Sequence, residues 1–329
     1  AWQDPYRDLS VPALEALLAR AEIGLGPGAS LESFLCAHFG LHSVESVAPY
    51  SRVADGVTAD YPYWLRADPV YLQAQREQLM LVDGRMLAIS MEEAQALAAA
   101  LNQHFAQDGL SILAAHPSRW YIGLAAAPAI STFTLAQVAG QGMNACLPTG
   151  DDSKWWHQRI NEAQMLMHTH PVNAAREARA APLINSLWVW GGGTAQDLAK
   201  KPTEKYWASD ALARGLALSA DAAQANLPAH ATDLLAQRDD YSTHCVVLDD
   251  LRAATWYHDL DAWRTGLQHL DTRWIAPLLQ AQNEGLISEL SVHAISPQAM
   301  HHAVLGKTAR WRFWRRRHTL SHYAAPKSP

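Results

Sequence analysis

The sequence predicts an α/β fold because candidate strands alternate with candidate helices. β-branched and aromatic residues concentrate in four short runs, at 79–82, 120–124, 186–190 and 244–248. Longer stretches with apolar residues three or four positions apart lie between and beside them. In a chain of 329 residues, 49% of them hydrophobic, this alternation favours helices layered on sheets.

The helices follow from spacing and from end signals. Residues 11–23 have helical periodicity, glycines at 24, 26 and 28 indicate a loop, and 31–39 resumes the helical pattern. Ser90 and Glu93 form a capping box that starts a helix running to about residue 105. A longer helix is predicted at 260–282, with large apolar side chains on one stripe. The alanine-rich stretch 217–237 is either helix or surface connection.

Composition excludes several classes of protein. With 26 basic and 32 acidic residues the formal net charge is −6, which argues against a general nucleic-acid binder. Cys36, Cys146 and Cys245 are far apart and form no C-x-x-C pair, so a reducing compartment fits best. We find no apolar run of the roughly 18 residues needed to cross a bilayer and no signal-peptide pattern. A cytoplasmic protein without a membrane partner is expected.

The segment from residue 168 to 193 contains the clearest candidate site. His168 and His170 would point to the same side of an extended segment and could bind a metal, although buried or capping histidines explain them as well. Asn173, Arg176 and Asn185 combine a guanidinium with amide donors, which suits a carboxylate or phosphate group. The alternative is structural, because asparagines in turns bond their own backbone.

This segment resembles a motif of the archaeal-type cofactor-independent phosphoglycerate mutases. Their pattern H-P-x-N-x-x-R, a spacer, P-x-N, an apolar strand and a glycine-rich turn recurs in order from His170 to Gly193. Shorter likenesses occur at 11–14, 28–30, 39–40, 79–105 and 206–218. The resemblance covers about 11–294, and only the block from His170 to Gly193 is reasonably specific.

The chain resembles another group more closely, the bacterial proteins labelled regulatory protein RpfE. The shared elements are A-D-P-V-x-L, H-P-V-N-x-x-R, N-S-L-W-x-W-G-G-G and a terminal R-x-W-R-R. They match residues 67–72, 170–176, 185–193 and 311–317.

The resemblance to the mutases implies a fold of the alkaline phosphatase superfamily. We therefore expect a layered α/β/α core formed by 1–50 and 180–320, a smaller inserted α/β subdomain at 51–179, and a disordered tail at 321–329. In that superfamily two divalent metals held by Asp and His activate a serine, and Ser30 matches its position.

The metal ligands implied by the resemblance are incomplete in this sequence. Leu31 stands where an aspartate should follow Ser30, and the N-terminal strand ending in an aspartate has no counterpart. The remaining candidate ligands are His258, Asp261 and His293, with His301 and His302 beyond them. Loss of carboxylates removes the charge that holds the metals, so no cofactor is expected; manganese or zinc would be required if the protein were active.

Simpler interpretations exist for the same residues. A serine directly before a helix is usually an N-cap, which we favour for Ser30. Asp259 and Asp261 lie where the first turn of a helix favours negative charge.

The run 310–317 alternates basic and aromatic residues. This composition suits nucleic-acid backbones, membrane surfaces or acidic partners. Because the chain as a whole is acidic, we prefer an edge strand with an arginine-rich outer face, and phosphate binding is the minority interpretation.

Three hypotheses follow. The leading one is a pseudoenzyme, a degenerate phosphomutase-like protein with a binding or regulatory role, through an anion pocket at Asn173, Arg176 and Asn185. The second is an active phosphomutase or phosphatase with a metal site rearranged from His168, His170, His258, Asp261 or His293. The third is an interaction module, homodimeric or with another protein, that uses the thirteen tryptophans. The expected partner is a small anion or a protein, and nucleic acid is disfavoured.

Overall fold

The computed structural model describes residues 4–41, 46–75, 78–139, 146–237, 239–309, 312 and 314–324. It divides into two compact units. Unit 1 consists of Ala1–Phe34 and Asn226–Pro329, and unit 2 is Leu35–Ala225. These boundaries differ from those expected at 50, 51, 179 and 180, because the strand after residue 185 joins the sheet of unit 2. Helices and strands alternate along the chain, so the predicted α/β class is confirmed.

Unit 2 is built on an antiparallel sheet around the long strand β2 (Tyr63–Gln75). β5 (Arg119–Leu124) pairs with its first residues, β3 (Gln78–Asp83) with its last, and β6 (Ser186–Gly193) along its middle. β4 (Ser111–His116) pairs with β5. The predictions at 79–82, 120–124 and 186–190 are confirmed as β3, β5 and β6, whereas the central strand β2 was not predicted.

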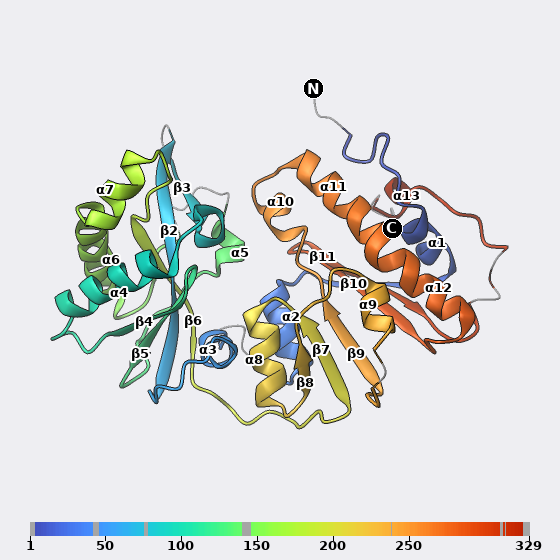
Figure 1. The fold of residues 1–329 in the computed structure, drawn as a ribbon, viewed down its shortest axis with the longest axis horizontal. Coiled ribbons are helices and arrows are strands. Elements are labelled where there is room, and N and C mark those ends of the chain that lie inside the picture. The colour runs from blue at the N-terminus through green and yellow to red at the C-terminus, as the bar shows by residue number, and fades with distance from the viewer. Residues whose placement is uncertain are drawn as a thin grey trace. The chain divides into compact units, whose positions relative to one another are not determined.

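Helices cover both faces of this sheet (Figure 1). On one face, α4 (Met91–His104), α6 (Ser153–His168) and α7 (Pro171–Ala178) enclose the main core with Leu65, Trp120 and Val189 of the strands. α3 (Ala48–Ala54) packs on the other face against β2 and β6. The predicted capping box starts α4, since Ser90 Oγ accepts the N–H of Glu93 at 3.2 Å and Glu93 Oε2 accepts that of Ser90 at 3.0 Å.

The rest of unit 2 packs beside α3. α8 (Ala211–Ser219) contacts α3 closely, because a Cβ at Gly215 would lie 1.9 Å from the carbonyl oxygen of Tyr50. β7 (Glu204–Ala208) and β8 (Ala223–Ala225) pair in parallel across α8. The 3₁₀ helix η1 (Gly84–Leu87) and the short α5 (Leu135–Val138) complete the unit.

Unit 1 contains an antiparallel sheet in the order β1-β11-β10. β1 is Glu22–Pro27, β10 Leu290–Ile295 and β11 Ala299–Leu305. One face of this sheet packs against α1 (Pro12–Arg20) and α12 (Ala276–Glu284), with Leu17, Leu279 and Leu305 in the core. The prediction of a glycine-rich loop at 24–28 is wrong over most of its length, because the strand β1 forms there. β11 supplies the pairing partner, and Gly24 leaves room for the ring of His302.

Other elements of unit 1 follow the predictions in part. α2 (Leu31–His38), which begins in unit 1 and ends in unit 2, forms where 31–39 was predicted. The helix expected at 260–282 is α11 (Leu260–Leu270), a π-helical turn η2 (Asp271–Ile275) and α12. The strand expected at 244–248 is β9 (Thr243–Val247), preceded by α9 (Ala231–Leu235) and followed by α10 (Arg252–Trp256).

The C-terminal predictions need correction. An edge strand was expected at 310–317, but the described residues of this segment, Arg312 and 314–317, form no strand. Instead Arg312 Nη2 donates to Glu22 Oε1 at 2.8 Å, so the segment is held by side chains rather than by a ladder. The disordered tail expected from 321 begins as the helix α13 (Leu320–Ala324), and 325–329 lie outside the described residues. Within the described chain, no helix is both long enough and apolar enough to cross a membrane.

The buried carboxylate of Asp271 connects two distant parts of unit 1. Val11 provides no side-chain cap for α1, and Asp271 Oδ1 accepts the N–H of Leu14 at 2.6 Å while Oδ2 accepts that of Ala13 at 3.3 Å. Burial raises the pKa of this carboxyl group, and the two N–H donors oppose that rise. A residue in the π-helical turn thus caps a helix 257 positions earlier in the sequence.

We predict that Asp271→Ala lowers the free energy of unfolding by about 2 kcal/mol, since it leaves the first N–H groups of α1 without an acceptor. Thr272→Ala, at the exposed neighbouring position, is the control and should change it by less than about 0.5 kcal/mol. Urea denaturation followed by circular dichroism measures both values. Equal losses in the two variants would show that Asp271 does not cap α1.

Candidate functional site

Ser30, the predicted nucleophile, begins helix α2. Its hydroxyl oxygen accepts the N–H of Ser33 at 3.0 Å, and Ser33 Oγ accepts the N–H of Ser30 at 2.9 Å. This reciprocal pair is the N-cap that the sequence favoured. The preceding turn is tight, because a Cβ at Gly28 would lie 1.9 Å from the carbonyl oxygen of Pro297. The backbone geometry around Ser30 is therefore accounted for by helix initiation.

The candidate ligands around residue 258 lie at the junction of two helices. His258 is exposed and has a φ of 54°, a left-handed conformation that turns the chain between α10 and α11. Asp259 accepts the N–H of Ala262 at 2.9 Å as the N-cap of α11, and Asp261 lies exposed in its first turn. The alternative interpretation, that these carboxylates serve the helix start, fits their positions.

His293 lies on the sheet of unit 1 opposite His302. The two residues are a cross-strand pair of β10 and β11, and their rings stack with centroids 6.2 Å apart. The ring of Phe34 from α2 lies 5.2 Å from that of His293. Burial, together with the nearby His302, lowers the pKa of His293. The lowered pKa favours the neutral form of His293, whose ring nitrogen can then bind a metal or a proton.

The donors present do not fit the two-metal site that the resemblance implies. Among the described residues, no three His, Cys, Asp or Glu side chains group closely enough to hold a metal ion. His258, Asp261 and His293 are thus not brought together as one ligand set. A pair of divalent cations needs several carboxylate oxygens, and the position after Ser30 is occupied by Leu31.

His168 and His170 were expected on an extended segment. The structure instead places them at the ends of two helices. His168 ends α6, and His170 is the N-cap of α7, its Nδ1 accepting the N–H of Val172 at 3.2 Å. Burial lowers the pKa of His170, which keeps Nδ1 available as an acceptor. The capping alternative therefore describes His170.

The two asparagines of the predicted anion pocket bind the backbone. Asn173 Nδ2 donates to the carbonyl oxygens of Met167 and Ile184, both at 2.8 Å, and its Oδ1 accepts the N–H of Ile184 at 2.9 Å. Asn185 exchanges two hydrogen bonds with the backbone of Leu72, at 2.7 and 3.0 Å. The role of both asparagines is structural, but the bonds join α7 to residue 184 and residue 185 to β2, rather than each asparagine to the backbone of its own turn as the alternative had it.

Arg176, the third residue of that pocket, is fully buried. Its Nε donates to the carbonyl oxygen of Pro182 at 2.6 Å, Nη1 to Glu93 Oε2 at 2.6 Å, and Nη2 to the carbonyl oxygen of Leu87. Arg179 donates to the other oxygen of Glu93 from an exposed position. The guanidinium thus already has an anionic partner inside the protein, and the geometry favours its structural role.

A buried charge cluster on β2 was missed by the sequence analysis. Arg66 Nη2 donates to both carboxylate oxygens of Asp68, at 2.7 and 2.8 Å, and Trp190 Nε1 donates to Asp68 Oδ2 at 2.7 Å. The guanidinium also lies over the ring of Tyr121, 5.5 Å from its centroid. Burial lowers the pKa of Arg66, but the charge of Asp68 outweighs it, so the guanidinium stays charged.

A second ion pair extends this cluster to α3. Asp55, just after α3, accepts from Arg119 Nε at 2.9 Å, from Arg119 Nη2 at 2.6 Å and from the Tyr121 hydroxyl at 2.7 Å. Burial alone would raise the pKa of Asp55, but the bonds from Arg119 hold it below its ordinary value. The one feature of the sequence that could have indicated this cluster is the spacing of Arg66 and Asp68, which lie two residues apart and therefore on one face of a strand.

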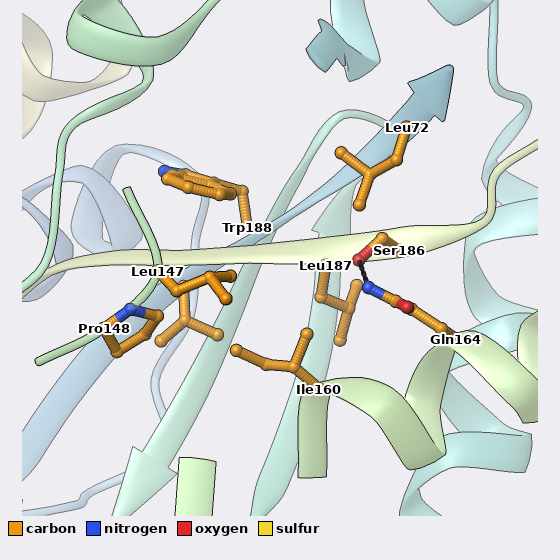
Figure 2. A pocket seen from close by; sticks show the side chains of 9 residues that line it. Leu72, Leu147, Pro148, Ile160, Gln164, Ser186, Leu187 and Trp188 are labelled. Atoms are coloured by element: carbon orange, nitrogen blue, oxygen red, sulfur yellow. Dashed lines mark hydrogen bonds between the residues drawn. The ribbon is translucent and has the colours of Figure 1, made fainter. Parts of the chain in front are cut away.

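The enclosed space near β6 is too small for a substrate (Figure 2). Its volume is about 10 Å³, room for a single water molecule at most. Leu147, Ile160 and Leu187 line it, and the Gln164 Nε2 to Ser186 Oγ hydrogen bond of 3.0 Å crosses one side. This space is a packing defect rather than a binding pocket.

Comparison with known proteins places these observations in context. No family model matches the chain. A 2,3-bisphosphoglycerate-independent phosphoglycerate mutase of Methanosarcina mazei is 24% identical over 197 residues, which are 56% of this chain and 48% of the relative. The chain is distantly homologous to cofactor-independent phosphoglycerate mutases. The match spans about half the length of that relative.

Two solved structures align with most of the chain. The PH0037 protein of Pyrococcus horikoshii aligns with a TM-score of 0.55 at 14% identity, over 92% of this chain and 81% of that one, so the two share a fold. A cofactor-independent phosphoglycerate mutase of Thermoplasma acidophilum aligns with a TM-score of 0.45 at 13% identity, over 92% and 84% of the two chains.

We predict that Arg176→Ala lowers the free energy of unfolding by about 3–5 kcal/mol, because it removes the buried cation that pairs with Glu93 and the donor to two carbonyl groups. Arg179→Ala is the matched control. Its side chain is 54% exposed and binds the same carboxylate, so its loss should cost less than about 1 kcal/mol. Chemical denaturation measures the free energy of unfolding of both variants. Similar losses would mean that the burial of Arg176 does not determine its contribution to stability.

Glu93 also makes stability depend on pH. Burial raises its pKa, but the N–H of Ser90 and the two arginines outweigh burial, so its pKa lies below 4.5 in the folded protein. The stability that the ionised carboxylate contributes is present above about pH 4.5 and is lost as the pH falls through the folded pKa.

We therefore predict that Glu93→Gln is less stable than the wild type at neutral pH and that this difference shrinks below pH 4.5. Thermal unfolding between neutral and acidic pH measures it. Glu177→Gln, at an exposed position of α7, is the control and should follow the wild type throughout. A difference that grows on acidification would contradict the assigned direction.

Proposed function

We propose that this protein is a phosphoglycerate-mutase-like pseudoenzyme with a binding or regulatory role. Support comes from its distant homology to cofactor-independent phosphoglycerate mutases, combined with the residues at the positions that catalysis would need. We further propose a cytoplasmic location and a relationship to the bacterial regulatory proteins labelled RpfE.

One observation carries the proposal. Ser30 has the position of a nucleophile, yet its hydroxyl accepts the N–H of Ser33 as a helix cap, and a leucine follows it. A serine alcohol becomes a nucleophile only when a base or a metal removes its proton. The candidate ligands His258 and Asp261 lie instead at a helix junction.

A second candidate function rests on the His293 and His302 pair. These two adjacent imidazoles lie beside Phe34 of α2 and could both bind a metal ion. The function would then be that of a metal-dependent phosphomutase or phosphatase with a rearranged site. Manganese or zinc would be its cation. These two donors alone are fewer than such a site needs, so this function is second.

The decisive measurement combines metal content and turnover. Protein incubated with manganese and zinc is analysed by plasma mass spectrometry, and the same sample is assayed for hydrolysis of p-nitrophenyl phosphate and for interconversion of 3- and 2-phosphoglycerate. We expect neither stoichiometric metal nor turnover.

Ser30→Ala and Ser33→Ala are matched variants for this assay, because each removes one half of the same cap. Under our proposal both lower stability by about 1 kcal/mol and neither changes activity. Metal-dependent turnover that disappears in Ser30→Ala and persists in Ser33→Ala would establish the second function instead.

A further inference from the structure

Unit 1 has a shallow hollow with a basic rim and an aliphatic floor. Its volume is about 570 Å³. Its lining includes the apolar residues Leu18 of α1, Ala21 and Ile23, which we call the floor, and the basic residues Arg315, Arg316 and His318, which we call the rim. Neither the anion pocket nor the Ser30 region includes any of these residues.

Side-chain bonds hold the basic segment in place. Arg312 donates to Glu22 Oε1 at 2.8 Å and to the carbonyl oxygen of Arg20 at 3.2 Å, and Arg315 Nη1 donates to the carbonyl oxygen of Ala21 at 3.3 Å. Arg312 thereby neutralises Glu22, the one carboxylate among the described residues that line the hollow. Arg316 is exposed and makes no hydrogen bond or ion pair with the residues that the structure describes, so its charge faces solvent.

The strand beside the hollow has an unpaired edge. Across the described ranges, β1 pairs with β11 only, and none of the lining residues belongs to β11. Ile23 and Leu25 of β1 are 42% and 69% exposed, which is unusual for apolar residues on an edge strand. Such an edge offers main-chain N–H and C=O groups to an additional strand.

We propose that this hollow binds an acidic, extended peptide segment of a partner protein, which aligns with β1 and places carboxylates on Arg315 and Arg316. Its apolar side chains lie on Leu18 and Ile23. The proposal deepens the binding role proposed above and rests on it.

The shape and chemistry of the hollow select this occupant. Bases of single-stranded nucleic acid stack on aromatic rings, whereas the floor is aliphatic and Tyr323 is the one tyrosine, phenylalanine or tryptophan among the described lining residues. A lipid surface offers no strand to pair with the free main-chain groups along the edge of β1, whereas an extended peptide does. Alternating acidic and apolar side chains match a basic rim over an aliphatic floor.

The test uses a fluorescein-labelled peptide of about ten residues with alternating glutamate and valine, titrated with the full chain in fluorescence anisotropy. We expect saturable binding that weakens between about 50 and 300 mM salt. Arg316→Glu should weaken it about tenfold, since it reverses a rim charge without breaking a described bond. Ile23→Asp tests the floor and should weaken it as well.

Arg273→Glu is the control, an exposed arginine of the same unit in the π-helical turn, and should change affinity less than about twofold. Circular dichroism verifies that each variant is folded. No saturable binding by the wild type, or equal effects of Arg316→Glu and Arg273→Glu, would overturn the proposal.

A labelled uridine RNA of the same length and vesicles containing phosphatidylserine are competing probes. If either binds more tightly than the peptide, the surface serves nucleic acid or membrane and the peptide proposal is wrong. The turnover assay is independent of this titration. Turnover without peptide binding would refute the proposed function and this inference together, whereas absence of both would refute only the inference.

Discussion

The strand register of the sheet in unit 2 depends on the buried ion pair between Arg66 and Asp68 on its central strand. Both side chains leave water, and a lone charge there would cost several kcal/mol, at least about 3–5 when one partner is removed. The indole N–H of Trp190 on β6 and the ring of Tyr121 on β5 complete the pair. A shift of either neighbouring strand by one residue would move these rings to the opposite face, so the pair constrains the register of three strands.

Buried polar contacts also explain the motif from His170 to Asn185. Asn173, Arg176 and Asn185 bind backbone groups or Glu93, and Arg176 joins α7 to α4. A motif shared with an enzyme family can thus specify packing rather than chemistry. The resemblance to phosphoglycerate mutases is then informative about the fold, while the functional question moves to surfaces such as the basic hollow.

Local signals predicted local structure well. The Ser90 and Glu93 capping box, the Ser30 cap and the runs that became β3, β5 and β6 depend on neighbours in the sequence. β2 was missed because it contains a proline and buried charges, which argue against a central strand until the partners are known. β1 was predicted as a loop because its glycines are loop-like unless a neighbouring strand pairs with them.

By itself, the sequence determined the α/β class, several helix starts and the likeness to the mutases. Only the tertiary structure decided which polar residues face a partner and which face solvent. Arg176 and Arg316 are alike in sequence terms, yet one is buried against Glu93 and the other lies on an open rim. The reason is physical: the environment of a charge is set by segments distant in the chain, which local patterns do not contain.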